Sequence, residues 1–257
     1  LFFTDHGKGF QAKVFEIPDA SRTAKGKSVH NFLEIPPEEK ISAIVSYDAK
    51  NKKSFLVMAT LSGLIKKTSI EDFANVRRTG ILAIKLKNND LLKWVKPTSG
   101  QDELILTTAL GQAIRFKEKD VRAMGRSASG VSALRLKKGD YLAGLDIINE
   151  EDKAKNSQSK LLVIMTNGFA KQTPLKEYKT QRRGGGGIKT AKITAKTGII
   201  IASHVVDENF EEILAFSSKG LALRTQLKNV RLTGRATQGV KIMNLESDDK
   251  LMGVACL

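Results

Sequence analysis

Cysteine is almost absent from this sequence, since Cys256 is the one cysteine in 257 residues. A single thiol cannot form an internal disulfide, so the fold must depend on its apolar core, and a reducing compartment suits such a chain. The sequence also lacks a secretory leader and any apolar run near the roughly 20 residues of a membrane-spanning helix. We therefore expect a cytoplasmic location and no membrane partner. The opening segment Leu1–Thr4 has the pattern of a strand interior, which predicts that the chain is part of a longer protein.

Patterns typical of catalytic and metal sites are missing as well. The three histidines, His6, His30 and His204, lie far apart in the sequence at spacings that no metal site uses. No cysteine pair, no helical His-Glu motif and no nucleophile elbow is present. Catalysis needs acids, bases or ligands that converge. We therefore expect a domain that is not an enzyme on its own, with no catalytic residue, metal, cofactor or small-molecule substrate.

Acidic residues are outnumbered: 27 Asp and Glu stand against 43 Lys and Arg, which gives a formal net charge of +16 and a pI near 9.8. A field of this sign attracts polyanions, and the candidates are nucleic acid, an acidic membrane surface or an acidic protein. The apolar fraction of 41% is sufficient for a core, so the chain is not a disordered basic tail.

Internal repetition organises the chain. Five segments share an apolar run, a turn with a glycine and then a basic residue, and these first glycines are Gly7, Gly63, Gly111, Gly168 and Gly220. A second glycine follows in a polar, basic loop, 19 residues later in four repeats and 17 in the second; the second glycines are Gly26, Gly80, Gly130, Gly187 and Gly239. This constant register predicts one supersecondary unit per repeat.

Short runs such as ILAIKL from Ile81 and VSALRL from Val131 alternate apolar and other residues at period two, which indicates strands. Three or four strands in about 50 residues match a propeller blade. We expect an all-β fold, a propeller-like disc of repeated four-stranded blades that forms a single domain over residues 1–257. The approximate blades are 1–47, 48–99, 100–148, 149–205 and 206–257.

Basic residues recur at fixed places in the repeats. Four residues before the second glycine stand Arg22, Arg126, Arg183 and Arg235, and the shorter second repeat has Arg77 and Arg78 in the equivalent loop. Others follow the first-glycine turns, namely Lys13, Lys66, Lys67, Arg115, Lys171 and Arg224. Because an arginine fork grips phosphate oxygens in pairs, the sets predict a positive belt that binds the phosphates of a nucleic acid. Arg122, Lys189 and Arg231, in or beside the same loops, complete the expected DNA contacts.

The segment Gln181–Gly187, which we call the tetraglycine loop, contains Gln181, Arg182 and Arg183 before four glycines. Arginines beside glycines form an adaptable phosphate grip, because glycine lets backbone N–H groups approach the phosphate closely. The alternative is a flexible linker, but the segment is in register with the other arginine loops. It is not a Walker loop, because Ile188 stands where that motif has a glycine before the lysine.

The five repeats, VRAMGR from Val121, GRATQG from Gly234 and the tetraglycine loop resemble the C-terminal domain of DNA gyrase A, in order with repeats two to six of that family. The resemblance implies a six-bladed β-pinwheel whose neighbouring blades exchange strands. It implies a bacterial, nucleoid-associated domain that bends and wraps duplex DNA around a basic rim for supercoiling. The remainder of gyrase A and, through it, gyrase B are the implied partners. ATP and Mg then belong to other parts of that ATP-dependent type IIA topoisomerase.

Two departures from that family limit what is carried over. Its signature box, Q-R-R-G-G-(Lys or Arg)-G, belongs to a first repeat that would precede Leu1, whereas the tetraglycine loop lies in the fifth repeat of that numbering and has Gly186 at the basic position. We therefore do not assign this loop the full role of the box. Two alternatives remain open: the equivalent DNA-binding domain of topoisomerase IV, and a propeller that serves as a protein-interaction scaffold. A scaffold would present apolar patches and no basic belt.

Overall fold

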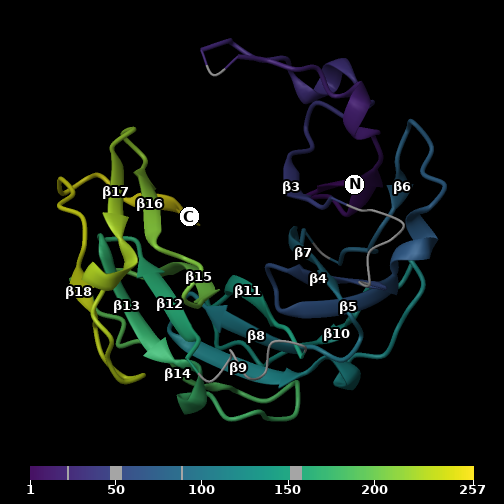
Figure 1. Cartoon of the computed structure of the whole chain (residues 1–257). Helices are drawn as coiled ribbons and strands as arrows, with labels where there is room; N and C mark the ends of the chain where they lie inside the picture. The colour runs from purple at the N-terminus through teal and green to yellow at the C-terminus, as the bar shows by residue number, and fades with distance from the viewer. Residues whose placement is uncertain (22, 47–53, 88, 151–157) are drawn as a thin grey trace. The chain divides into compact units, whose positions relative to one another are not determined.

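The structure is a computed structural model that describes residues 1–21, 23–46, 54–87, 89–150 and 158–257 (Figure 1). The chain divides into two compact units, the first formed by Leu1–Gly100 and Val121–Val131, the second by Gln101–Asp120 and Ser132–Leu257. The helices of the described part are single 3-10 turns, and none of them is long and apolar enough to cross a membrane. They are η1 (Val14–Glu16), η2 (Val29–Asn31), η3 (Ile70–Phe73), η4 (Glu118–Asp120), η6 (Leu175–Glu177) and η7 (Leu227–Asn229).

Two four-stranded sheets are built mainly from the first unit. The order of the first sheet is β3-β1-β2-β6 and that of the second is β10-β5-β4-β7. The strands are β1 (Phe2–Thr4), β2 (Lys8–Phe10), β3 (Ile41–Ile44), β4 (Phe55–Thr60), β5 (Leu64–Ser69), β6 (Ile81–Leu82), β7 (Leu92–Thr98) and β10 (Val131–Ser132). Phe3, Leu56, Met58, Phe73 and Leu92 belong to the buried cluster of this unit.

The second unit contains three sheets, with the orders β11-β8-β9-β14, β15-β12-β13-β18 and β17-β16-β19. The first two are formed by β8 (Glu103–Thr108), β9 (Gln112–Lys117), β11 (Leu142–Ile148), β12 (Lys160–Met165), β13 (Phe169–Pro174), β14 (Ile188–Lys189), β15 (Ile200–Val206) and β18 (Val240–Lys241). The third is formed by β16 (Glu212–Ser217), β17 (Ala222–Gln226) and β19 (Leu251–Cys256). The central strands β8 and β12 are almost fully buried and contain the apolar runs 104–106 and 161–165, as expected of strands covered on both faces.

Each four-stranded sheet has two edge strands, and one of them comes from the following repeat. We call this strand, which pairs with the second strand of the hairpin, the exchanged outer strand. β6 pairs with β2 through Lys8↔Leu82, β14 pairs with β9 through Ile188↔Ala113, and β18 pairs with β13 through Ala170↔Val240. The predicted all-β fold of repeated, propeller-like blades with exchanged strands is confirmed. In the described part of the chain the fifth sheet has three strands. The domain limits and blade boundaries remain predictions.

Each of the five first glycines forms the same kind of tight turn. In each repeat their N–H donates to the carbonyl three residues earlier, as in Gly111 to Thr108 at 3.1 Å and Gly220 to Ser217 at 3.1 Å. Their φ angles are positive, +87° at Gly111 and +84° at Gly220, a conformation that glycine adopts without steric cost. A Cβ on Gly111 would lie 2.7 Å from the Ala191 carbonyl oxygen, which belongs to the next repeat. A Cβ on Gly220 would meet no described atom within 4 Å.

These two glycines provide a matched stability test of the strand exchange. Gly220→Ala should cost only the left-handed backbone penalty, about 1–2 kcal/mol of unfolding free energy. Gly111→Ala should cost about 1–3 kcal/mol more, because the added methyl displaces the backbone of the next repeat. Chemical denaturation of both variants, followed by circular dichroism, measures the difference. Equal losses would show that the next repeat does not press on the Gly111 turn.

Candidate nucleic-acid interface

In the second to fifth repeats, the arginine loop, which is the segment between the 3-10 turn and the second glycine, lies on the sheet of the preceding repeat. After the 3-10 turn, the chain makes a parallel bridge to the second strand of that sheet, with Lys67↔Ala123 on β5 and Gln172↔Leu232 on β13. The loop then crosses to the second glycine and enters the exchanged outer strand. At Gly80 a Cβ would lie 2.7 Å from the Phe10 ring, so glycine allows the close approach of loop and preceding sheet. The strand exchange therefore fixes the position of the arginine loops of the second to fifth repeats.

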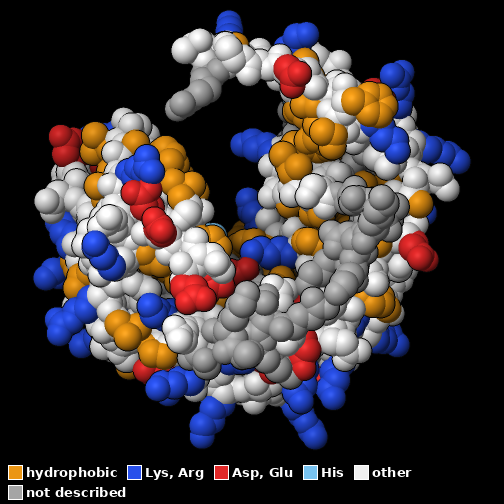
Figure 2. Space-filling view, viewed as in Figure 1, with side chains coloured by type: hydrophobic (Ala, Val, Ile, Leu, Met, Phe, Trp, Pro, Cys, Tyr) orange, Lys and Arg blue, Asp and Glu red, His pale blue; other side chains and the backbone are white. Residues whose placement is uncertain are grey.

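Exposed basic side chains occupy these loops in both units. In the first unit Arg77, Arg78 and Arg122 are exposed and Arg126 is half-buried. In the second unit Arg182, Lys189 and Arg231 are exposed, while Gln181, Arg183 and Arg235 are half-buried. Figure 2 shows Lys and Arg side chains gathered over the region of β14 and β18 in the second unit. Lys13 is exposed beside η1, and Arg22 lies outside the described residues.

The tetraglycine loop is tied to its surroundings by hydrogen bonds to the main chain. Gln181 N donates to Arg115 O at 2.7 Å, and Gly184 N donates to Ala133 O at 2.6 Å. The Arg183 guanidinium donates from Nε to Asp120 O at 2.8 Å and from Nη1 to Ser132 O at 3.1 Å. Arg182 is exposed and makes no hydrogen bond or ion pair within the described part of the chain. The loop is therefore an ordered turn that presents Arg182 outward, and the linker alternative does not hold.

Three exposed basic residues that the sequence prediction omitted lie against these loops. Lys85 N donates to Ala128 O at 3.2 Å, Arg135 N donates to Gly185 O at 2.8 Å, and Lys192 N donates to Thr237 O at 2.9 Å. Each stands five residues after a second glycine, and its amide binds the arginine loop of the following repeat. That spacing was the available signal, but it was interpreted only as strand alternation. Lys241, exposed on β18 at the position equivalent to Lys189, was missed in the same way.

Two of the predicted phosphate contacts are interior lysines, and both side chains are 0% exposed. Lys66 Nζ donates to Ala83 O at 2.5 Å and to Arg126 O at 2.6 Å. Lys171 Nζ donates to Thr190 O at 2.9 Å and to Gly234 O and Arg235 O, both at 2.6 Å. Burial lowers the pKa of each ammonium to about 8. The expectation that Lys66 and Lys171 contact phosphate is corrected, because neither ammonium reaches the surface.

The next residue in the turn also makes internal contacts. Lys67 is 6% exposed, and its ammonium lies 5.1 Å from the centre of the Phe55 ring. Arg115 Nε donates to Glu103 at 3.0 Å, and Arg115 Nη1 donates to Leu175 O at 3.2 Å. Arg224, although exposed, donates from Nε to Glu212 at 2.7 Å. Paired or buried cations offer little to a phosphate, so we exclude these three side chains from the candidate interface.

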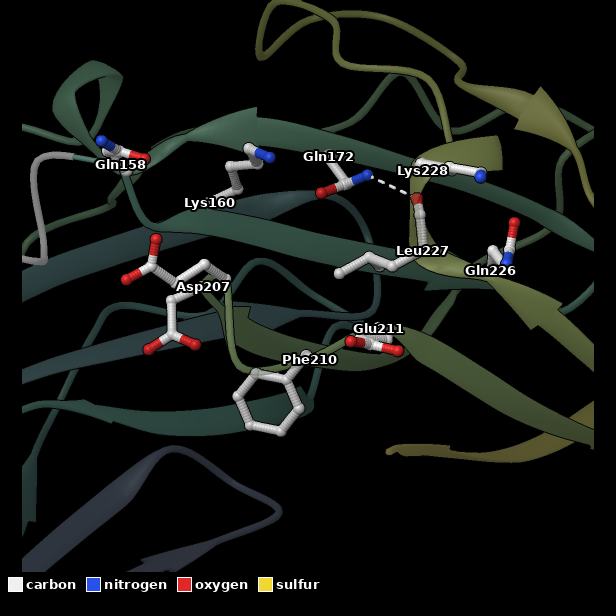
Figure 3. Close-up of a pocket in the computed structure, with 10 residues that line it drawn as sticks. Gln158, Lys160, Gln172, Asp207, Phe210, Glu211, Gln226, Leu227 and Lys228 are labelled. Carbon is white, nitrogen blue, oxygen red and sulfur yellow. Dashed lines mark hydrogen bonds between the residues drawn. The ribbon is translucent and has the colours of Figure 1, made fainter.

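Gln172 occupies the position of Arg115 in the fourth repeat and borders a hollow of about 360 Å³ (Figure 3). Its Nε2 donates to Leu227 O at 2.8 Å and to Val230 O at 2.7 Å, which ties η7 to β13. Asp207, Glu208 and Glu211 line the hollow with Lys160 and Lys228. Because acidic side chains outnumber basic ones there, the hollow does not suit a phosphate, and the candidate interface is confined to the loops. No cluster of His, Cys, Asp or Glu among the described residues suits a metal ion.

The interior lysines predict a specific pH dependence of stability. Their pKa is about 8 in the folded state against 10.5 for an ordinary lysine, so the unfolded chain binds more protons between these values. The unfolding free energy of the wild type should therefore rise with pH in this window, relative to Lys66→Met or Lys171→Met. Denaturant titrations at about pH 7 and about pH 10 measure the change. A difference between wild type and variant that is equal at both pH values would contradict the lowered pKa.

Comparison with known proteins agrees with this arrangement. Residues 1–46, 54–99, 102–149, 160–207 and 211–257 match the family model described as DNA gyrase C-terminal domain, beta-propeller. The chain is 39% identical over 257 residues to the DNA gyrase A protein of Mycolicibacterium smegmatis, covering 99% of this chain and 30% of that protein. It is 36% identical over 246 residues to the DNA gyrase A protein of Staphylococcus epidermidis, covering 95% of this chain and 27% of that protein. The chain thus spans less than a third of the length of these relatives.

Solved structures show the same fold. The C-terminal domain of DNA topoisomerase IV superposes with a TM-score of 0.88 at 25% identity, over 100% of this chain and 78% of that one. A DNA gyrase A C-terminal domain superposes with a TM-score of 0.82 at 24% identity, over 99% of this chain and 80% of that one. Since the family model matches all five repeats, the chain belongs to the family of DNA gyrase C-terminal domains.

Proposed function

We propose that this domain binds duplex DNA without reading its sequence, and that it bends and wraps the DNA to serve supercoiling by DNA gyrase. The observation that supports the proposal is the set of exposed arginines and lysines on loops that successive repeats present in the same way. The partners are double-stranded DNA, the remainder of gyrase A and, through it, gyrase B, in the nucleoid of a bacterial cytoplasm. The domain itself performs no bond-making step; the strand-passing chemistry of the topoisomerase lies in other parts of the enzyme.

Phosphate contacts supply the binding energy in this proposal. Exposed loop cations such as Arg78, Arg122, Arg182 and Arg231 are available to phosphate oxygens. Each neutralised phosphate releases condensed counterions, so the affinity depends on salt and hardly on sequence. Bending a duplex of 20–30 base pairs by 40–90° costs about 1–6 kcal/mol, which several such contacts offset. Loops fixed on a rigid sheet keep their cations in place, so little ordering entropy is lost on binding.

Binding should therefore weaken steeply with salt. With about 8–10 phosphates contacted, log affinity should fall against log salt with a slope near −7 to −9. Fluorescence anisotropy with labelled duplexes of two unrelated sequences measures slope and sequence tolerance together. Arg182→Ala should reduce the slope by about 0.9 without changing the melting temperature.

Lys219 provides the matched control for Arg182. Its ammonium lies 2.6 Å from Asp248 and 2.9 Å from Glu246, away from the arginine loops in the sequence. Lys219→Ala removes the same charge and should leave the slope unchanged. A slope shallower than about −3 would contradict a distributed phosphate contact and favour the scaffold alternative. Equal effects of the two variants would mean that net charge alone drives binding.

Wrapping is tested separately from binding by ligating nicked circular DNA with and without the domain. A handed wrap fixes writhe, so the ligated circles should have a shifted linking-number distribution in proportion to the amount of domain bound. The shift should be lost at a salt concentration that releases the DNA. Binding without any shift would retain the DNA-binding proposal and reject wrapping by these five repeats.

A further inference from the structure

One position in the repeats alternates between apolar residues and lysine. The residue three places after the first glycine is, in chain order, Phe10, Lys66, Ile114, Lys171 and Leu223. In the first four repeats this side chain lies beneath the arginine loop of the following repeat. A Cβ on Gly80 would touch the Phe10 ring, and a Cβ on Gly185 would lie 3.8 Å from Ile114 Cδ1. The two lysines replace this apolar contact with hydrogen bonds to the loop.

Both lysines bind the main chain of the loop arginine itself. Lys66 Nζ donates to Arg126 O, and Lys171 Nζ donates to Arg235 O, each at 2.6 Å. Each ammonium also binds a carbonyl just after the exchanged strand of its own repeat, Ala83 O after β6 at 2.5 Å and Thr190 O after β14 at 2.9 Å. An ammonium has three donors, and Lys171 uses all of them on carbonyl oxygens. A single buried cation thus joins the arginine loop to the exchanged strand beneath it.

The tetraglycine loop, which lies over Ile114, is fixed in a different way. There Arg183 donates its own guanidinium N–H groups to Asp120 O and Ser132 O. In the loops above Lys66 and Lys171, the loop arginine does not anchor the loop with its own guanidinium. Arg126 makes no side-chain hydrogen bond or ion pair with any described residue, and Arg235 Nε lies 3.8 Å from Glu177. The lysine fixes the loop, so the Arg126 guanidinium stays available for an external anion, whereas the Arg235 guanidinium keeps one long ion pair with Glu177.

The charged groups around each lysine are few. Asp72 and Arg126 act on Lys66, and Glu177 and Arg235 act on Lys171. The acid partly offsets the burial of the ammonium, and the loop arginine opposes it. A buried cation that is not closely paired is costly, and its retention at two equivalent positions indicates a role beyond packing.

We propose that Lys66 and Lys171 are positioning residues of the DNA-binding surface, each of which holds the arginine loop of the following repeat so that Arg126 or Arg235 points to the phosphate backbone. The inference rests on the proposed DNA-binding function and adds to it the residues that orient the contacts.

The first test measures duplex affinity of the whole chain by fluorescence anisotropy for Lys66→Met, Lys171→Met and the control Ile114→Met. Methionine keeps the length and apolar stem of lysine but removes the donors. Each lysine variant should bind about threefold to tenfold more weakly, as expected for the loss of one or two hydrogen bonds that order a contact. Ile114→Met should bind like the wild type. Thermal melting of each variant checks that the fold is retained.

A double-mutant cycle separates positioning from the loss of a positive charge. If Lys66 acts through Arg126, then Lys66→Met should have no further effect on affinity in an Arg126→Ala background. It should keep its full effect in an Arg235→Ala background, because that arginine belongs to a different loop. Equal effects in both backgrounds would overturn the proposal and attribute the loss to net charge.

A measurement without DNA distinguishes failure of this inference from failure of the proposed function. Hydrogen exchange of the loop amides, including Ala128 N, which donates to Gly125 O, should be faster in Lys66→Met than in the wild type. Thr233 and Arg235 amides should respond to Lys171→Met in the same way. Unchanged exchange overturns the positioning role even if DNA binds. Faster exchange in a protein that shows no salt-dependent DNA binding keeps the positioning role for the loop and rejects the DNA-binding function.

Discussion

The exchange of the outer strand is the constraint on which the other features of this molecule depend. The Gly7 carbonyl accepts from Ile84 N at 3.1 Å, and the Gly168 carbonyl accepts from Met243 N at 3.3 Å, so each turn is completed by the next repeat. The arginine loop precedes the exchanged strand and must follow it onto the neighbouring sheet. A loop arginine is therefore positioned by the repeat before its own. In the three-stranded fifth sheet, a Cβ on Gly220 would meet no described atom within 4 Å.

The same constraint divides the basic residues into two groups. Side chains just after the first glycine, such as Lys171 and Arg115, point to the following repeat and donate to its carbonyl oxygens. Side chains in the arginine loops, such as Arg182 and Arg231, point outward. A positive charge of +16 is therefore not one surface field, because part of it holds repeats together. We therefore expect removal of an interior lysine to disturb the order of the neighbouring loop more than it changes the electrostatic potential at the protein surface.

Much of the fold was predictable from the sequence, and the limits have physical reasons. Glycine spacing predicted the turns because a positive φ strongly favours glycine, and the N–H of Gly111 makes the turn hydrogen bond that this predicts. The interior position of Lys66 was not predictable, because its acceptor Arg126 O lies 60 residues away. The ion pair between Arg115 and Glu103 joins the two strands of one hairpin, so it could have been predicted from the strand register. Local patterns reveal turns and strands, whereas the destination of a long cation depends on chain segments distant in sequence.

Two ways of fixing a loop lead to the same electrostatic result. In the tetraglycine loop Arg183 is used for anchoring and Arg182 faces outward, so the loop offers one available guanidinium. Over Lys66 the lysine performs the anchoring, and Arg126 keeps its guanidinium without a side-chain partner among the described residues. Repeats with different residues thus each present a guanidinium from the same loop, although Arg182 stands one position earlier in its loop than Arg126 does. A duplex bent without sequence recognition needs regularly spaced cations rather than identical contacts, because its phosphates are regularly spaced and chemically alike. If the loops bind phosphate as proposed, the residue three places after the first glycine is free to vary between lysine and an apolar residue, provided that one arginine in the loop keeps its donors for phosphate.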